Sequence, residues 1–167
     1  MPHSPEVSLQ DVDDVVMEAL LALARRDASP DEVAPPLGGP GWTAERTAWF
    51  RNHHRGAADG LNGPAAEKTW AVLYDGEVAG SVRLKRVDVQ GARPAGETGI
   101  WLGRGYRSRG IGGSALRLVL AEAGKAGLAQ VVARTLAGNH AMQRLLSGLG
   151  ATLTGDDDGT VLAAVEL

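Results

Sequence analysis

Apolar residues recur along this chain at two different spacings, and the change from one to the other falls near residue 69. Before it, the spacing is helical, and one helix face is formed by Val12, Val16, Leu20 and Leu23. This pattern predicts a helix that begins at the acidic residues around Asp13, preceded by a short strand over residues 7–9. Thr43 can cap a second helix over residues 44–54, and the proline-containing residues 27–41 are predicted to be a loop.

From there onward, apolar and polar residues alternate, which is the period of a β-strand. Strands are predicted over residues 70–74, 78–87 and 97–102, with a tight turn at Asp75–Gly76 and a loop around Gly91. Downstream, a helix, a strand, a helix and a final strand are predicted over residues 113–126, 130–136, 139–149 and 160–166, with one more strand before the last. The element order β-α-α-β-β-β-α-β-α-β-β predicts a single mixed α/β domain.

Composition excludes several classes of function. A length of 167 residues suits one domain, and the lack of cysteine excludes disulfides, thiolate zinc sites and a cysteine nucleophile. The net charge of -3 argues against nucleic acid as a partner, and no spacing of His, Asp and Glu indicates a metal site. The longest apolar stretch, residues 15–24, contains Glu18 and is too short to span a membrane. With no basic secretion segment at the N-terminus, the expected location is the cytoplasm.

Glycine is unusually frequent, with 23 residues, about twice the usual share of roughly 7%. Five of them lie between a predicted strand and a predicted helix, at Gly103, Gly105, Gly110, Gly112 and Gly113. Free backbone N–H groups and the helix dipole make such a junction an anion site, and Arg107 and Arg109 add positive charge. The segment lacks the Lys-Ser/Thr of a nucleoside-triphosphate loop, and the next strand lacks the acidic residue of a dinucleotide site. Another phosphate-containing ligand is therefore expected.

Two neighbouring segments resemble the GNAT superfamily of acyl-CoA-dependent N-acetyltransferases. Residues 107–112, Arg-Ser-Arg-Gly-Ile-Gly, match its Arg/Gln-x-x-Gly-x-Gly/Ala pyrophosphate loop. Residues 97–102, Glu-Thr-Gly-Ile-Trp-Leu, are similar to a strand of the branch that contains ribosomal-protein N-terminal acetyltransferases. Further on, Asn139 and Leu149-Gly150 resemble the Asn…Leu-Gly-Phe helix of the superfamily.

This resemblance implies a fold and a ligand. The fold is one GNAT-type domain over residues 1–167 with a mixed, mostly antiparallel sheet, in which residues 1–69 form the acceptor side and residues 70–151 the acyl-CoA-binding core. The ligand is acetyl-CoA, as co-substrate, without a metal. Its pantetheine arm would pair with the strand at Ile100, Trp101 and Leu102 and contact Asn139. Its pyrophosphate would be held around Arg107, Arg109, Gly110, Ile111, Gly112 and Gly113.

Catalysis needs a base, because a typical alkylamine is mostly an ammonium ion at pH 7. Glu97 is the predicted general base, since it opens the strand expected to carry the thioester; a solvated carboxylate at a strand edge is the alternative interpretation. His53 and His54 are rival bases, although a histidine pair at a helix end can simply complement the helix dipole. Leu146 stands where many members of the family have a tyrosine that protonates the leaving thiolate. Because the pKa of a thiol is only about 8.5, the thiolate can leave without an acid.

The amine acceptor is the least determined part. Trp42, Trp49 and His53 are candidates for its binding wall, with core packing as the alternative for the two tryptophans. The net charge and the acidic turn at residues 156–158 favour a cationic small molecule, such as an aminoglycoside-type antibiotic. The strand similarity favours a protein N-terminus instead, and a catalytically silent acyl-CoA sensor would fit the missing tyrosine. The expected partner is a small-molecule or peptide amine, not nucleic acid or a membrane, and a homodimer is left open.

Overall fold

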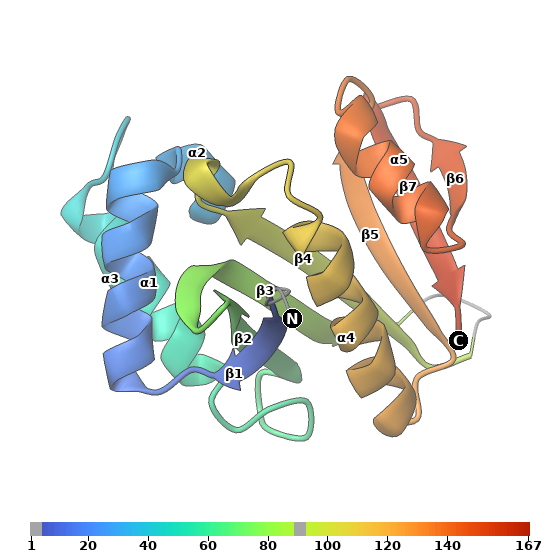
Figure 1. Cartoon of the computed structure of the whole chain (residues 1–167), viewed down its shortest axis with the longest axis horizontal. Helices are drawn as coiled ribbons and strands as arrows, with labels where there is room; N and C mark the ends of the chain where they lie inside the picture. Colours follow the sequence, from blue (N-terminus) through green and yellow to red (C-terminus); the bar gives the residue numbers. More distant parts are fainter. Residues whose placement is uncertain (1–4, 89–92) are drawn as a thin grey trace.

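A single seven-stranded sheet organises the computed structural model, which describes residues 5–88 and 93–167; the predicted loop glycine Gly91 lies outside these residues. The strands are β1 (Val7–Asp11), β2 (Glu67–Tyr74), β3 (Glu77–Val87), β4 (Ala95–Leu102), β5 (Gln130–Leu136), β6 (Thr152–Gly155) and β7 (Thr160–Glu166). Their order across the sheet is β1-β2-β3-β4-β5-β7-β6 (Figure 1). Neighbouring strands are antiparallel except β4 and β5, which are parallel. The predicted mixed, mostly antiparallel α/β domain is confirmed.

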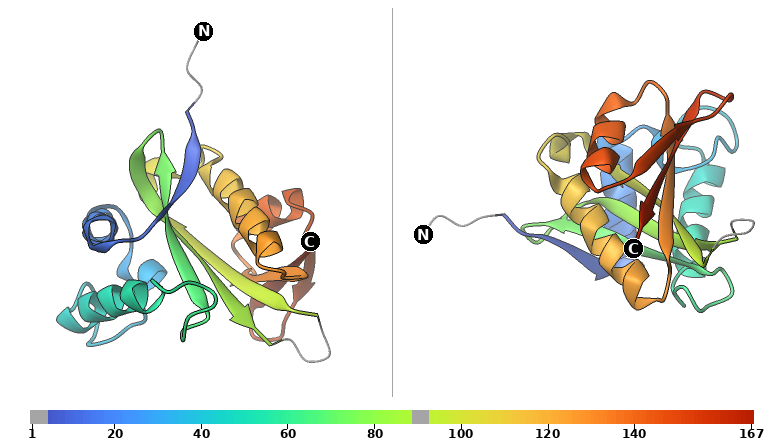
Figure 2. Two further views of the ribbon diagram at one scale, coloured as in Figure 1. Left: turned by 90° about the horizontal axis from the view of Figure 1, so that it is seen from below. Right: turned by 90° about the vertical axis from the view of Figure 1, so that its right-hand side faces the viewer.

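Helices cover both faces of this sheet. They are α1 (Asp14–Asp27), α2 (Pro30–Val33), α3 (Ala44–Gly56), α4 (Ile111–Lys125) and α5 (His140–Gly148), with a 3-10 turn at Arg104–Tyr106. The first three lie on one side of the sheet and α4 and α5 on the other (Figure 2). Thr43 caps α3, as predicted, by accepting a hydrogen bond from the amide of Arg46. None of these helices in the described residues is long and apolar enough to cross a membrane.

The alternation along β3 sends its side chains to opposite faces. Val82 and Leu84 are fully buried in the main core, beneath α4. Ser81, Arg83 and Lys85 point the other way, toward α3. Burying a Val or Leu side chain contributes about 1.5–3 kcal/mol, so the two apolar residues hold the register of the strand. A second, smaller core beneath α1 and α3 contains Val16, Met17, Leu20, Leu21, Phe50 and Ala71.

The predicted loop over residues 27–41 is not wholly a loop, because α2 forms a single helical turn within it. Ser29 and Glu32 complete a reciprocal capping box around this turn. Pro30 occupies the first helical position, where its missing N–H costs no hydrogen bond. A helix of four residues is too short to produce the apolar periodicity from which the longer helices are predicted.

Several boundaries differ from the prediction by two or three residues, among them the end of β1 at Asp11, the start of β4 at Ala95, and the starts of β2 and α4. β2 begins at Glu67 rather than at Trp70, because polar residues on this strand face a cleft and not open solvent. α4 begins at Ile111 rather than at residue 113. Its cap position is taken by Gly110, which has no side chain that could mark a helix start.

Candidate active site

The parallel strands β4 and β5 separate from each other partway along their length (Figure 1). Within the described residues they pair only at Ala95–Glu97 of β4, whereas β3 pairs with β4 as far as Leu102. The amide of Gly103 donates to the carbonyl of Ala79, toward β3, and backbone groups alternate in direction along a strand. The peptide groups of Ile100 and Leu102 therefore face the gap. An extended ligand can add to such an edge as if it were another strand.

The glycine-rich segment lies at the wide end of this gap and leads into α4. Gly110 holds the cap position with a φ of 78°, a left-handed conformation that glycine adopts without steric cost. No described side chain caps this helix. The first amides of α4, from Ile111 to Gly113, therefore have no side-chain cap at the positive end of the helix dipole, an arrangement that suits an anion.

Arg107 lies within this segment but is engaged by its neighbours. Its guanidinium donates to the carbonyl of Leu102 at 3.0–3.1 Å and to Oε2 of Glu32 at 2.7 Å. The amide of Gly105 likewise donates to Asp27, at 2.9 Å. Two acidic residues of the first 69 thus hold the segment expected to bind pyrophosphate.

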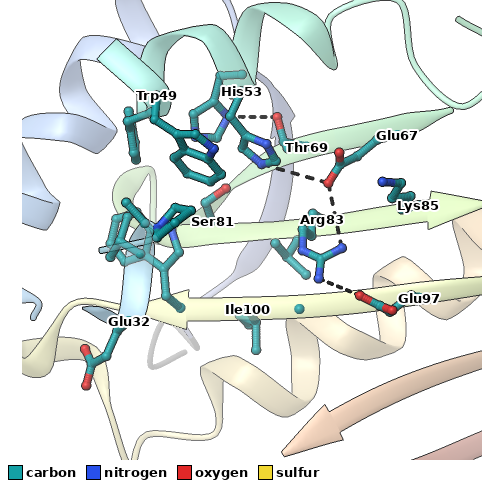
Figure 3. Close-up of a pocket in the computed structure, with 18 of the residues that line it drawn as sticks. Glu32, Trp49, His53, Glu67, Thr69, Ser81, Arg83, Lys85, Glu97 and Ile100 are labelled. Carbon is teal, nitrogen blue, oxygen red and sulfur yellow. Dashed lines mark hydrogen bonds and ion pairs between the residues drawn. The ribbon is translucent and has the colours of Figure 1, made fainter. Parts of the chain in front are cut away.

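On the opposite face of the sheet, a cleft of about 920 Å³ lies between β2–β4 and the helices α2 and α3 (Figure 3). Apolar side chains form its walls: Val33, Ala34, Pro35, Pro36, Trp49, Phe50, Val87 and Trp101. Polar and charged side chains, mostly from the three strands, form its floor: His53, His54, Glu67, Thr69, Ser81, Arg83, Lys85 and Glu97. The cleft therefore combines apolar surface with a few convergent polar groups, as ligand sites usually do.

The register of the sheet arranges the charges of the floor. Glu67, Lys85 and Glu97 are directly opposite one another on β2, β3 and β4. Arg83, two residues before Lys85, lies between the two carboxylates. Its Nη2 donates to Oε1 of Glu97 at 2.7 Å, and its Nη1 is 3.7 Å from Oε1 of Glu67 (Figure 3). The Glu97 side chain is 41% exposed and the Glu67 side chain 12%, so Glu97 is the more accessible of the two carboxylates that Arg83 joins.

Gly99 makes room for this arrangement. It is the cross-strand partner of Arg83 on β4, and a Cβ atom added to it would lie 3.2 Å from Nε of Arg83. A side chain at position 99 would require the Arg83 guanidinium to shift by a few tenths of an ångström. The lack of a side chain at Gly99 therefore leaves room for the Arg83 guanidinium.

His53 lies at the cleft wall, between an aromatic ring and a carboxylate. Its ring stacks on Trp49 at 4.7 Å between centroids, and its Nε2 is 3.9 Å from Oε1 of Glu67. Burial lowers the pKa of His53; Glu67 opposes this shift, while the cations Arg83 and Lys85 reinforce it. His53 is therefore neutral at pH 7 and can accept a proton.

His54 is buried, and its Nδ1 is 2.9 Å from Oγ1 of Thr69. Burial, reinforced by the nearby His53, lowers its pKa from 6.5 to about 4. The folded protein therefore binds this proton less readily than the unfolded chain, so acid favours unfolding. The contribution of His54 to stability is complete above pH 6.5 and is lost as the pH falls toward 4.

We expect the free energy of unfolding to decrease by up to about 3 kcal/mol over this pH range on account of His54. Urea unfolding at pH 7 and at about pH 4 measures the decrease. His54→Gln, which keeps a polar group for Thr69 but does not titrate, should reduce the difference between the two pH values. His140→Gln, at an exposed position, is the control and should leave it unchanged. Equal pH dependence in wild type and His54→Gln would contradict the prediction.

Only some of the predicted site residues line the cleft. Glu97, Trp49 and His53 line the cleft together, whereas Trp42 lies outside its lining, edge-on to Phe50 at 6.4 Å between centroids. The Trp101 side chain points to the opposite face of the sheet from those of Ile100 and Leu102. Its cross-strand partner is Ser81 on β3, and its side chain packs toward α1 and α3.

Asn139, Leu146 and Arg109 are found elsewhere. Asn139 caps α5 by accepting a hydrogen bond from the amide of Met142 at 3.2 Å. Leu146 is buried in the main core. Arg109 is exposed at the start of α4, and no ion pair to it is formed within the described residues. Roles for these residues in ligand binding stay predictions.

Glu67, Arg83 and Lys85 belong to the site but were missed in the sequence. In the sequence, the alternation of Arg83 and Lys85 with Val82 and Leu84 predicts only a strand over residues 78–87. Their juxtaposition with Glu97 depends on strand register, which no local pattern contains. No group of three or more metal-ligating side chains is found in the described residues.

Residues 7–152 match the sequence model of a family described as acetyltransferase (GNAT) domain. No curated protein matches the sequence closely enough to count as a relative.

Several solved structures share the fold over nearly the whole chain. RimL, a ribosomal L7/L12 alpha-N-protein acetyltransferase in complex with coenzyme A, has a TM-score of 0.75 at 17% identity, covering 99% of this chain and 97% of its own. The GNAT domain of S. lividans PAT has a TM-score of 0.72 at 20% identity, covering 98% and 90%. YncA, a putative acetyltransferase from Salmonella typhimurium with acetyl-CoA, has a TM-score of 0.65 at 19% identity, covering 96% and 94%.

Proposed function

Because this chain belongs to the GNAT acetyltransferase family, we propose that it transfers acetyl from acetyl-CoA to a primary amine that enters through the cleft. One observation carries this proposal. Glu97 is the last residue at which β4 pairs with β5, and its side chain lines the cleft on the other face. A thioester held in the gap and an amine held in the cleft would therefore meet beside the same carboxylate.

The residues along the gap fit acetyl-CoA. Peptide groups at Ile100 and Leu102 face it, and the uncapped amides from Ile111 to Gly113 suit a pyrophosphate. Arg107 already reaches the carbonyl of Leu102, so its guanidinium is near the same ligand path. We infer that these groups orient the acyl donor, and that Arg109 adds positive charge at the phosphate end.

Glu97 is the proposed general base. Its carboxylate is accessible from the cleft and is oriented by the 2.7 Å hydrogen bond from Arg83. In the reaction, the amine nitrogen forms a bond to the acetyl carbon, the carbon–sulfur bond breaks, and the amine proton passes to Glu97, directly or through water. The released thiolate needs no acid from the position of Leu146, since a thiol has a pKa of about 8.5. His53, neutral and close to Glu67, is the second candidate for the base.

Residues 1–69 would supply the acceptor wall through α2 and α3. The floor of the cleft offers no excess negative charge to the polycationic acceptor expected from the sequence, since Arg83 and Lys85 there balance Glu67 and Glu97, and Asp31 and Glu32 pair with Arg46 and Arg107. A peptide N-terminus carries only one positive charge at its end, so it depends less on excess negative charge in the cleft. The resemblance of residues 97–102 to ribosomal-protein acetyltransferases favours that alternative.

Ligand binding and thiol release together test the proposal. We expect acetyl-CoA to raise the Tm of the protein, while NAD and ATP at the same concentration do not. We also expect free thiol to appear when acetyl-CoA is mixed with a panel of primary amines that includes aminoglycosides, N-terminal peptides and amino acids. Equal Tm shifts from the three nucleotides would contradict the acetyl-CoA site. A selective shift without thiol release for any amine would favour the silent sensor.

A further inference from the structure

Lys85 is unusual among the charged side chains that line the cleft. The four acidic ones each form an ion pair with an arginine, as Asp31–Arg46, Glu32–Arg107, Glu67–Arg83 and Glu97–Arg83. Lys85 alone forms no ion pair within the described residues, although it lies between two glutamates in the register of the sheet. Both of these glutamates pair with Arg83 instead.

The ammonium group of Lys85 is exposed to solvent and also faces the cleft. The residue lines the cleft beside Glu67 (Figure 3), and its charge contributes to the lowered pKa of His53. Lys85 is also the direct cross-strand partner of Glu97, and side chains so placed have Cβ atoms about 4.5–5.5 Å apart. The site thus offers a carboxylate and an unpaired cation side by side.

This pairing discriminates among amines by their charge. Arg83 is paired with Glu67 and Glu97, so an acceptor whose only charges are positive is repelled mainly by Lys85 as it approaches Glu97. An acceptor with a carboxylate next to its amine can place the carboxylate against Lys85 and the amine against Glu97. Both of its charges then have a partner, through charge-assisted hydrogen bonds.

Apolar surface adjoins these two charges. Trp49, Val87 and Trp101 are partly exposed in the cleft lining, and they suit an apolar side chain on the acceptor. We propose that the acceptor is an α-amino acid with an apolar or aromatic side chain, whose carboxylate is bound by Lys85 while its amine faces Glu97. This assignment rests on the proposed acetyl transfer and specifies the acceptor for it.

Three probes that share one aromatic group and one amine test this assignment: phenylalanine, phenylalaninamide and phenethylamine. Each is mixed with acetyl-CoA and the intact protein, and kcat/KM is obtained from thiol release. We expect phenylalanine to be preferred over the two others by at least about tenfold, the effect of a charge-assisted contact. In Lys85→Gln this preference should fall by at least about tenfold. Comparing the preference between proteins cancels the different intrinsic reactivities of the three amines.

Lys125→Gln is the matched control, because Lys125 lies on α4 outside the cleft and pairs with Glu122; it should leave the preference unchanged. A preference that survives in Lys85→Gln overturns the role of Lys85. Faster acetylation of phenethylamine or of the amide by the wild type, with kcat/KM expressed per neutral amine, overturns the amino-acid assignment but leaves acetyl transfer intact. If none of the three probes is acetylated, the assignment is also wrong, and the wider amine panel then decides separately whether the protein is an acetyltransferase.

Discussion

Replacing Glu97 with glutamine is expected to lower kcat for acetyl transfer by about two to four orders of magnitude, the usual contribution of a general base. Glutamine has nearly the same shape and can still accept a hydrogen bond from Arg83, but it cannot take a proton from the amine. The deficit should narrow as the pH rises toward the pKa of the acceptor amine, because the neutral amine then needs no base. Initial rates across pH measure both effects, and acetyl-CoA affinity should be retained.

Glu122→Gln is the matched control for this variant. The Glu122 side chain is 42% exposed, against 41% for Glu97, and pairs with a cation on α4, away from the cleft. Its kcat should equal that of the wild type. If Glu97→Gln keeps the wild-type rate and pH profile while His53→Gln loses activity, the base is His53 and not Glu97.

Replacing Gly110 with alanine is expected to weaken acetyl-CoA binding at least about tenfold. The residue has a φ of 78°, and a left-handed conformation costs other residues about 1–2 kcal/mol. No atom lies within 4 Å of where the new Cβ would be, so the loss would come from the backbone and not from a clash. A backbone that relaxes to relieve this strain turns the first amides of α4 away from the pyrophosphate. Isothermal titration with acetyl-CoA measures the loss.

Gly127→Ala separates binding from stability, because it repeats the same strain at the other end of α4. Gly127 has a φ of 81° and also has open space around it. Both variants should lose about 1–2 kcal/mol of stability, or about 2–8 °C in Tm, but only Gly110→Ala should bind acetyl-CoA more weakly. Equal affinities in the two variants would show that the start of α4 does not hold the ligand.

Sequence patterns predict most of this fold because its elements are long and strongly periodic. The alternation of Val82 and Leu84 with Arg83 and Lys85 predicts β3, and the turn at Asp75–Gly76 joins it to β2 as expected. The single turn α2 was missed, because four residues around Pro30 carry no apolar period. The start of β2 was missed because Glu67 and Thr69 are polar on the side that faces the cleft.

The candidate site was predicted to a smaller extent, for a different physical reason. Glu97 and the glycine segment stand in contiguous motifs, and a resemblance can identify them. Arg83 and Lys85 acquire their significance only when three strands align side by side, a relation among residues far apart in the chain. The engagement of Arg107 by Glu32 likewise joins segments 75 residues apart and has no local signature.

The register of β3 also limits how this protein can change in evolution. Because neighbouring side chains on a strand point to opposite faces, an insertion or deletion that shifts the register of β3 by one residue would turn Arg83 and Lys85 toward α4 and bring Val82 and Leu84 into the cleft. Such an event would bury two cations and empty the core at once. A one-residue change in the length of this hairpin therefore needs a bulge to absorb it, as the register shift between Val72 and Leu73 already does, whereas substitutions at the exposed Lys85 would alter the proposed acceptor preference without unfolding the chain.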